Sequence, residues 1–270
     1  HYPNQVVPLM RLLYVFKRPL LIINFHGEDL LFDDYNRWLG KQTMKFARYA
    51  NALIVPSDFF REEAIRRGLP PSKIHVSPSG GIDESLFSPA EIRKHSRNEL
   101  HLGFIGRLEE GKGVYEFMDT VDRLNIPVRA TVIGYGPLLD EVESRANGKL
   151  RVIGGVPQNE LPRFYSDFDL FIFPTKKQES LGLTGIESMA CGTPVIGSDI
   201  GGIPTYLQDG YNGYLVRPGS VNDLVEAIEK YARLSDTHKK QMQEHCLTTS
   251  LSFYRSAVAR RLAEIFIRVG

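Results

Sequence analysis

The feature that most constrains the fold of this chain is the alternation of short apolar runs with longer segments of helical periodicity. The apolar runs are rich in Val, Ile and Phe, as buried strands usually are. Strands that alternate with helices along a chain predict parallel sheets covered on both faces, the doubly wound α/β class. Strands are expected at 20–25, 52–55, 73–77, 100–105, 128–133, 150–153, 168–173, 194–197 and 213–216, and the clearest helices at 112–124, 137–146, 182–191 and 221–233.

A polar segment separates two parts of the 270-residue chain. Residues 88–99 contain a proline and show no apolar periodicity, as expected of a linker. The strands expected after it suffice for one nucleotide-binding-type domain, whereas too few precede it for a matching partner. We therefore expect a first Rossmann-like domain at 1–95 that is truncated at its N-terminus, a second at 96–250, and a C-terminal helix at 251–270 that packs back on the first domain.

Charge and cysteine content exclude several function classes. The net charge is +1, so nothing indicates a nucleic-acid or acidic-membrane partner. Cys191 and Cys246 suggest neither a disulfide framework nor a metal site, which favours a reducing, cytoplasmic compartment. No apolar run is long enough to cross a membrane. The apolar and basic stretch at 9–20 favours a half-buried helix; the alternative is a surface helix in peripheral contact with the inner membrane face.

Each unusual cluster of residues follows the carboxyl end of an expected strand, where open parallel sheets bind their ligands. The segment between Phe173 and Val195 carries two glutamates, Glu179 and Glu187, on either side of Gly182. We expect Glu179 in a loop and Glu187 about one turn inside the next helix. Both carboxylates can then face a ligand on the first N–H groups of that helix. The other clusters are 106–113, 134–137 and 154–161.

The first of these clusters, GRLEEGKG, contains the candidate cations for a diphosphate. Arg107 and Lys112 can each form a charge-assisted hydrogen bond, worth about 1.5–3 kcal/mol. Gly106 lets the backbone approach a ligand closely. The alternative is an ordinary connection with a solvated arginine and lysine.

Several other polar residues have a structural interpretation beside a functional one. A lone histidine is more often a structural residue whose hydrogen bonds are satisfied. The position of His26 at a strand end also suits a polar group in a cleft, and the same two interpretations apply to Asp29. Cys191 is interpreted as a small packed residue, because no histidine lies near it in sequence. Lys176 and Lys177 are interpreted as part of a solvated loop.

The glutamate segment resembles the E-x7-E signature of the family-4 retaining glycosyltransferases, which have the two-domain GT-B fold. GRLEEGKG resembles the diphosphate-binding loop of that family, and VPQNELPRFYSDFDLFIFPT resembles its strand–helix unit around the nucleobase. HGEDL and ALIVPSDFF resemble parts of its first domain, while SMACGTPVIGSDIGGIP and DGYNGYLVRPGSVNDLVEAI resemble the end of its second. The resemblance is nearly end to end and in the right order.

The resemblance implies roles for the residues on the donor side. Arg107 and Lys112 would hold the donor diphosphate, in the loop that Gly106 begins. Glu187 would face the ribose.

It also implies roles around the transferred sugar. Glu179 would face the sugar hydroxyls, and His26 would lie beside the reacting sugar. The backbone N–H groups of Leu181, Gly182 and Leu183 would bind sugar hydroxyls and phosphate, aided by the helix dipole.

The activity that the resemblance implies is transfer of a hexose, with retention of configuration, from a UDP- or GDP-sugar to a glycan or lipid-linked acceptor in polysaccharide synthesis. Cations beside the leaving diphosphate supply most of the stabilisation that this transition state needs, so neither a metal nor a cofactor is expected. Two alternatives are an isomerase resembling nucleotide-sugar 2-epimerases and a non-catalytic nucleotide-sugar binding module.

The chain departs from the family pattern at several positions. Ser180 and Leu181 stand where Gly and Phe are common, Tyr135 replaces an acid in the G-x-G turn, and Thr205 replaces a Glu after GGIP. PSGGID also has an extra residue. The strand and glycine-rich loop that begin the family's first domain are not seen. We therefore expect this chain to bind a sugar nucleotide but to transfer weakly or not at all by itself.

Overall fold

The computed structural model describes residues 20–270 except 28, 32–36, 79 and 89–98. Contacts divide the chain into two compact units. The first takes in His1–Gly81, Glu179–Leu181 and Phe253–Gly270, and the second takes in Ile82–Gln178 and Gly182–Ser252. The boundary expected at 95/96 lies outside the described residues, as does the helix expected at 9–20 apart from Leu20.

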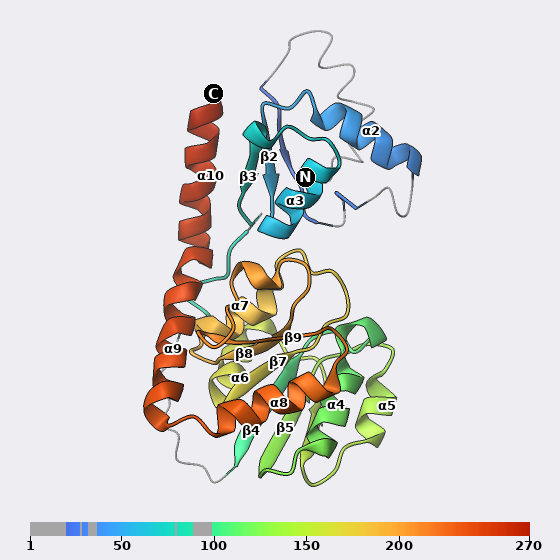
Figure 1. Ribbon diagram of the computed structural model, residues 1–270, viewed down its shortest axis with the longest axis vertical. Helices are drawn as coiled ribbons and strands as arrows, with labels where there is room; N and C mark the ends of the chain where they lie inside the picture. Colours follow the sequence, from blue (N-terminus) through green and yellow to red (C-terminus); the bar gives the residue numbers. More distant parts are fainter. Residues whose placement is uncertain (1–19, 28, 32–36, 79, 89–98) are drawn as a thin grey trace. The chain divides into compact units, whose positions relative to one another are not determined.

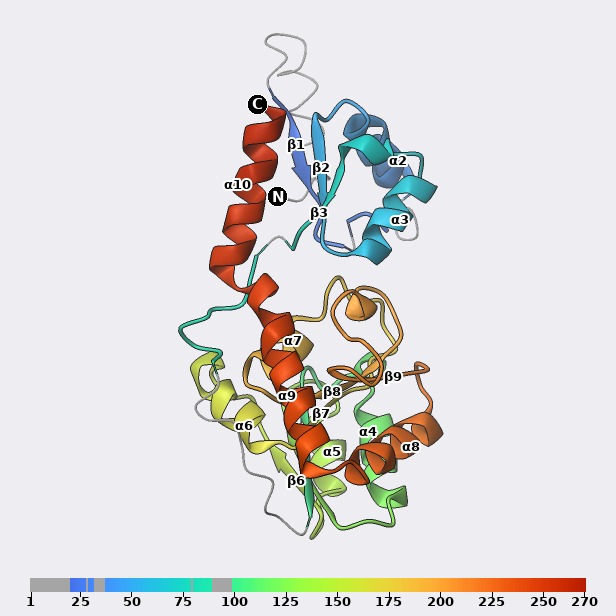
Figure 2. The same cartoon turned by 60° about the vertical axis from the view of Figure 1, so that its left-hand side comes forward.

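The described part of the first unit contains a parallel sheet in the order β1-β2-β3. Its strands are β1 (Ile22–Asn24), β2 (Ala52–Val55) and β3 (Ile74–Val76). Helices α2 (Arg37–Ala47) and α3 (Asp58–Arg66) lie on one face (Figures 1 and 2). Alternate strand residues, such as Ile23, Leu53 and Val55, form a buried cluster with Phe60 and Ala64 of α3.

The last helix, α10 (Arg255–Val269), covers the other face of the first unit's sheet, as Figure 2 shows. Ile265 packs with Ala52 and Ile54 of β2, and the partly buried Leu262 and Val269 join this cluster. The short sheet is therefore covered on both faces, which parallel strands require because neither of their faces is normally left to solvent.

The second unit is built on a six-stranded parallel sheet in the order β6-β5-β4-β7-β8-β9 among the described residues. Counted within the unit this is the order 3-2-1-4-5-6 of dinucleotide-binding sheets, whose direction of growth reverses between β4 and β7. The strands are β4 (Leu100–Ile105), β5 (Val128–Ile133), β6 (Leu150–Ile153), β7 (Leu170–Phe173), β8 (Val195–Ser198) and β9 (Gly213–Val216).

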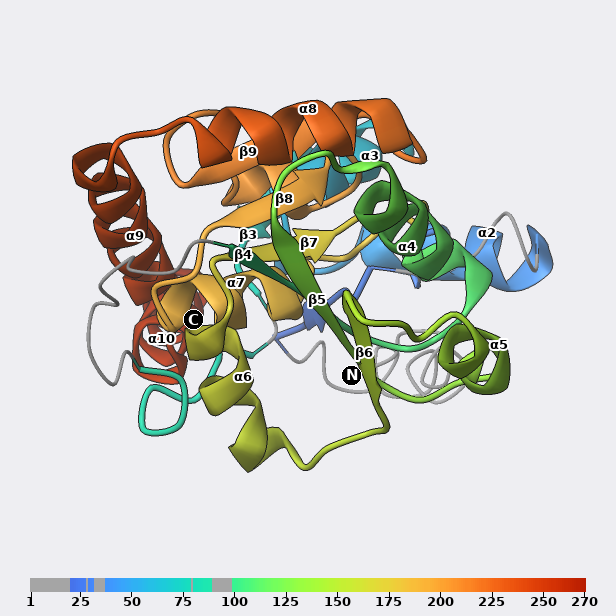
Figure 3. The same ribbon diagram turned by 90° about the horizontal axis from the view of Figure 1, so that it is seen from below.

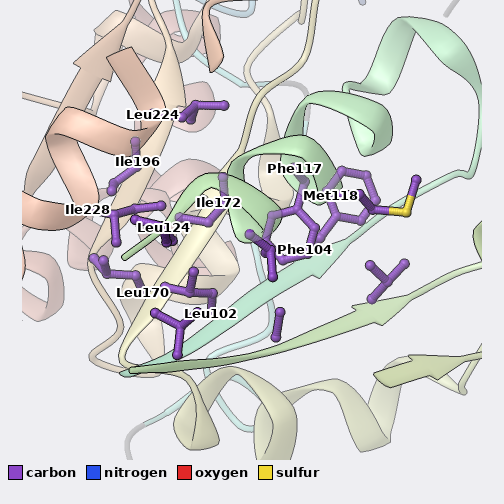
Figure 4. Close-up of a cluster of buried hydrophobic side chains, with 14 of the residues drawn as sticks. Leu102, Phe104, Phe117, Met118, Leu124, Leu170, Ile172, Ile196, Leu224 and Ile228 are labelled. Carbon is purple, nitrogen blue, oxygen red and sulfur yellow. The ribbon is translucent and has the colours of Figure 1, made fainter. Parts of the chain in front are cut away.

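Helices cover both faces of this second sheet (Figure 3). Residues such as Leu102, Phe104 and Ile172 meet Phe117 of α4 and Ile228 of α8 in one large cluster (Figure 4). Each such side chain contributes about 1.5–3 kcal/mol when fully buried. The helices are α4 (Val114–Arg123), α5 (Leu139–Ser144), α6 (Leu161–Asp167), α7 (Leu183–Ala190), α8 (Val221–Ala232) and α9 (Asp236–Ser250).

The doubly wound α/β class predicted from the alternating pattern is confirmed. Helix α8 illustrates why the sequence pattern predicts a helix here. Ser220 accepts a hydrogen bond from the backbone N–H of Asp223 at 3.2 Å and caps the helix. Leu224, Ala227, Ile228 and Tyr231 then recur at helical spacing and are buried.

A close approach at Gly103 tests the packing of the second sheet. A Cβ at Gly103 would lie 2.1 Å from the Phe168 ring, so Gly103→Ala must displace a buried aromatic side chain. We expect the free energy of unfolding to fall by about 1–3 kcal/mol, measured by urea denaturation with circular dichroism. A Cβ at the exposed Gly154 would meet nothing within 4 Å, so Gly154→Ala is the matched control. Equal stability of Gly103→Ala and the parent chain would contradict this packing.

Candidate functional site

The loops after β4 and β7 meet at the point where the second sheet reverses its direction of growth. Gly113 ends the first loop with φ +80°, and a Cβ there would lie 2.0 Å from the carbonyl oxygen of Pro174 in the second. The backbone N–H of Lys176 donates to the carbonyl oxygen of Gly111 at 2.9 Å. Glycine is thus required at Gly113 both for its left-handed backbone and for the contact.

The charged side chains of these two loops form a connected set. Glu109 lies 2.7 Å from the Lys177 ammonium group and 3.4 Å from Nε of Arg107. The hydrogen bond from Lys177 is the main reason why the pKa of Glu109 lies below its usual value. Lys176 pairs with Glu116 at 2.7 Å. The two lysines interpreted as a solvated loop are therefore ion-paired.

The guanidinium of Arg107 extends into solvent at the carboxyl end of β4, with 64% of the side chain exposed. Gly106 continues β4, because its N–H donates to the carbonyl oxygen of Ile133 at 3.1 Å. Lys112 ends the 3-10 turn Glu110–Lys112 that leads into α4. These three sequence-predicted residues lie in one loop.

Helix α7 begins at Leu183, directly after the left-handed Gly182. The hydroxyl of Tyr206 donates to the carbonyl oxygen of Gly182 at 3.1 Å and packs against Gly185. The side chain of Leu183 is 43% exposed. The first N–H groups of any helix have no partner within it, so this end of α7 suits an anion or a hydroxyl oxygen.

Glu187 lies one turn inside α7 and is buried, with 6% exposure. Its Oε2 accepts a hydrogen bond from the hydroxyl of Tyr165 at 3.1 Å, and its Oε1 accepts one from Nε2 of Gln158 at 3.4 Å. Burial raises the pKa of Glu187, and these two hydrogen bonds oppose the shift. A carboxylate that is costly to bury is held in place by two donors.

Tyr165 and Gln158 were not singled out from the sequence. Gln158 lies in one of the strand-end clusters, at 154–161, which was the available signal. Tyr165 lies in α6, is fully buried, and packs edge-on against Phe171. Nothing in the local sequence distinguishes it from a core tyrosine.

In the first unit, a buried carboxylate shapes the turn after β1. Asp29 accepts hydrogen bonds from the backbone N–H groups of His26, at 2.9 Å, and Gly27, at 3.0 Å. Burial raises the pKa of Asp29, while these backbone donors lower it. Glu179–Leu181 belong to the same unit, and the hydroxyl of Ser180 donates to the carbonyl oxygen of His26 at 2.6 Å.

The remaining candidates have simple environments. Cys191 is buried, and burial raises the pKa of its thiol to about 12, which makes it a poor nucleophile. Tyr135 is 68% exposed. The described residues contain no group of three metal-ligating side chains. No helix in the described part combines the length and apolarity needed to cross a bilayer.

Family models match both parts of the chain. The model described as glycosyl transferases group 1 matches residues 99–233, which is half of the chain, and the model described as glycosyltransferase family 4 matches residues 1–84.

Several similar curated proteins are glycosyltransferases or synthases by name. The chain is 29% identical to sulfoquinovosyl transferase SQD2 of Arabidopsis thaliana, covering 71% of this chain and 40% of that protein. It is 31% identical to alpha-maltose-1-phosphate synthase of Mycolicibacterium smegmatis, covering 69% and 52%. It is 26% identical to the amylovoran biosynthesis glycosyltransferase AmsK of Erwinia amylovora, covering 91% and 63%. The chain thus spans about half the length of the curated relatives it matches.

Solved structures show the same fold. The crystal structure of Anabaena Alr3699/HepE in complex with UDP has a TM-score of 0.84 at 20% identity, covering 98% of this chain and 77% of that one. Sucrose-phosphate synthase from Thermosynechococcus elongatus has a TM-score of 0.80 at 19% identity, covering 98% and 72%. The expected GT-B fold is confirmed.

The buried Glu187 carboxyl should make stability depend on pH. Because its pKa is raised in the folded state, its contribution is fully present below the ordinary carboxyl pKa and is lost as pH rises through the raised value. Glutamine carries no charge at any pH, so we expect Glu187→Gln to gain in melting temperature relative to the parent chain as pH rises from about 4 to about 8. Circular dichroism melts across this range measure the difference. Glu226→Gln at an exposed position of α8 controls for net charge. If the melting temperature of Glu187→Gln fell relative to that of the parent chain as pH rises, the claim that a charged Glu187 is costly to bury would be contradicted.

Proposed function

Because the chain belongs to the glycosyl transferases of group 1, we propose that it moves a sugar from a nucleotide-sugar donor to an acceptor in glycan or surface-polysaccharide synthesis. The observation that carries this proposal lies in the second unit. There an exposed arginine, a glycine-rich loop, a helix N-terminus and a buried glutamate gather at the carboxyl ends of strands where the sheet reverses direction. Sheets of this kind bind nucleotides at that point.

We assign the donor diphosphate to Arg107, Lys112 and the N-terminus of α7. Among the described residues, Arg107 forms one ion pair, of 3.4 Å at an exposed position, and such pairs are worth about 1 kcal/mol or less. A diphosphate therefore competes easily with Glu109 for the guanidinium. The cations and the helix N–H groups also stabilise the charge that develops on the leaving diphosphate, which is where a transferase needs it.

We assign the ribose to Glu187. Each carboxylate oxygen has two acceptor sites, so Tyr165 and Gln158 leave capacity for ribose hydroxyls. The protein donors hold the carboxylate in one orientation before the nucleotide arrives. A ribose hydroxyl adds a further hydrogen bond to a group whose charge is costly to bury, which favours binding.

The roles of Glu179 and His26 toward the transferred sugar rest on the family resemblance. In the proposed reaction the bond from the anomeric carbon to the diphosphate oxygen breaks, and a bond to the acceptor hydroxyl oxygen forms on the same face of the sugar. The acceptor proton leaves with the diphosphate. Retention of configuration and a hexose as the sugar are parts of this proposal.

UDP is the first nucleotide to try, because the Anabaena HepE structures contain UDP or UDP-glucose. Surface polysaccharide is the first acceptor class to try, because similar proteins are named for amylovoran and teichuronic acid biosynthesis. The two buried free thiols fit a reducing, cytoplasmic compartment. Peripheral contact with the inner membrane face would suit a lipid-linked acceptor.

Removing the two cations should weaken nucleotide binding. We expect Arg107→Gln with Lys112→Gln to raise the Kd for UDP by roughly ten-fold or more, because charge-assisted hydrogen bonds to the diphosphate are lost. Isothermal titration calorimetry on the full chain measures this. Arg233→Gln, at an exposed position directly after α8, is the matched control and should leave the Kd unchanged. An unchanged Kd in the double variant would refute the diphosphate assignment.

Removing the Glu179 carboxylate should affect turnover more than donor binding. The donor is chosen by thermal shift among UDP-, GDP- and ADP-sugars, and mass spectrometry then follows its products. The parent chain should slowly release free sugar and nucleotide, and Glu179→Ala should reduce that rate by roughly a hundred-fold, as expected for a group that contacts the reacting sugar. Glu226→Ala is the control at an exposed position.

The products also separate the competing functions. A new epimer of the donor would indicate an isomerase, and binding without any product would fit either a binding module or a chain that does not transfer by itself. Turnover that is the same in Glu179→Ala and the parent chain would overturn the role given to this residue.

A further inference from the structure

One face of the second sheet is unexpectedly polar toward the amino-terminal ends of its first three strands. Residues paired across neighbouring strands point to the same face, and so do alternate residues along one strand. Pairing and alternation together place four polar residues on one face: His101, Arg129, Thr131 and Arg151. The intervening residues, such as Leu102, Ala130 and Leu150, belong to the apolar core. Strands of a doubly wound sheet are usually apolar on both faces. A charged patch at the amino-terminal ends of three adjacent strands therefore points to a function and not to folding.

These polar residues line a pocket of about 500 Å³. Residues 146–153, Phe164 and Asp167 complete its wall. His101 and Arg129 are the second residues of their strands, and residues 146–149 lead into β6, so the pocket lies toward the amino-terminal ends of the strands. The donor site assigned above lies at the carboxyl ends. The two sites use opposite ends of the sheet.

The floor of the pocket is fixed by internal hydrogen bonds. His101 is buried, with Nδ1 2.9 Å from the main-chain oxygen of Asp167 and Nε2 2.8 Å from the hydroxyl of Thr131. Arg129 lies 3.1 Å from the Asp167 carboxylate and 3.6 Å from that of Glu99. The polar groups at the bottom are thus held in place before any ligand binds.

The mouth of the pocket carries positive charge that no described side chain neutralises through an ion pair. Lys149 and Arg151 are exposed and form no ion pair with any described residue. Lys149 is fixed at its backbone, because its N–H donates to Oδ1 of Asn147 at 2.8 Å. Together with Arg129 they place three cations around the pocket, against the carboxylates of Asp167 and Glu99, which both pair with Arg129.

Protection of a sheet edge explains only part of this arrangement. β6 is the edge strand of its sheet (Figure 3), and charged side chains on an edge discourage pairing with another chain. That accounts for Lys149 and Arg151. It does not account for the buried His101 and Thr131 or for a hollow of this size behind them.

We propose that this pocket is a second ligand site, which binds a small soluble phosphate monoester. The fork of an arginine fits phosphate oxygens, and Lys149 adds a point charge. The volume falls within the range of small-molecule sites and exceeds the need of a bare phosphate ion. None of the large apolar side chains exposed in the described residues lines the pocket, which favours a soluble ligand over a membrane surface. The proposal does not depend on glycosyl transfer.

Amide NMR spectra of the full chain test the proposal with two probes, inorganic phosphate and glycerol 2-phosphate, at constant ionic strength and pH. We expect saturable shifts of the amides of residues 147–152 with both probes, and tighter binding of the monoester. Arg151→Gln with Lys149→Gln should weaken this binding by roughly ten-fold. Arg233→Gln removes an exposed arginine elsewhere and should not change it.

The donor-site variant separates the two sites. In Arg107→Gln with Lys112→Gln, the shifts at 147–152 should keep their amplitude and midpoint. Shifts that vanish in that variant would show that the probes report the donor site, and the proposal would fail. It would also fail if the shifts do not saturate, if chloride reproduces them, or if they persist at full strength without Arg151 and Lys149.

Discussion

The contact between the loop after β4 and the loop after β7 is the constraint on which the rest of the second unit's site depends. Gly113 makes it possible, because any side chain there would strike the carbonyl of Pro174. The backbone hydrogen bond from Lys176 to Gly111 and the ion pair between Lys177 and Glu109 then join the loops. One loop carries the cations, and the other leads into α7. A single close approach therefore brings the positive side chains and the helix N-terminus to the same end of the sheet.

A second constraint on the site is the buried carboxylate of Glu187. Burying a charge costs free energy unless hydrogen bonds compensate it, and here Tyr165 and Gln158 do so only in part, since the pKa remains raised. A residue that merely filled space would be apolar. The cost is understandable if the carboxylate is held ready for hydroxyl groups of a ligand, which is the role proposed for it toward ribose.

The sequence was most informative where the signal is local and periodic. Strands such as 52–55 and 128–133 were placed correctly, because Val- and Ile-rich runs between turn residues rarely form anything else. The order of the strands and the contacts of Glu187 could not be read in the same way. Lys177 and Glu109 are 68 positions apart, and Gln158 and Glu187 are 29 apart, so the spacing of these residues in the sequence does not predict their contacts. The polar face at His101 and Arg151 was likewise hidden, because strand register decides which residues share a face.

The central claim is that Arg107, Lys112 and Glu187 form one nucleotide-binding site at the carboxyl ends of β4 and β7. A crystal structure of the full chain with UDP tests it most directly. The account predicts the diphosphate within hydrogen-bond distance of the Arg107 guanidinium and the Lys112 ammonium group, with a ribose hydroxyl on the Glu187 carboxylate. UDP bound elsewhere on the chain, or bound with its diphosphate turned away from these two cations, would contradict it.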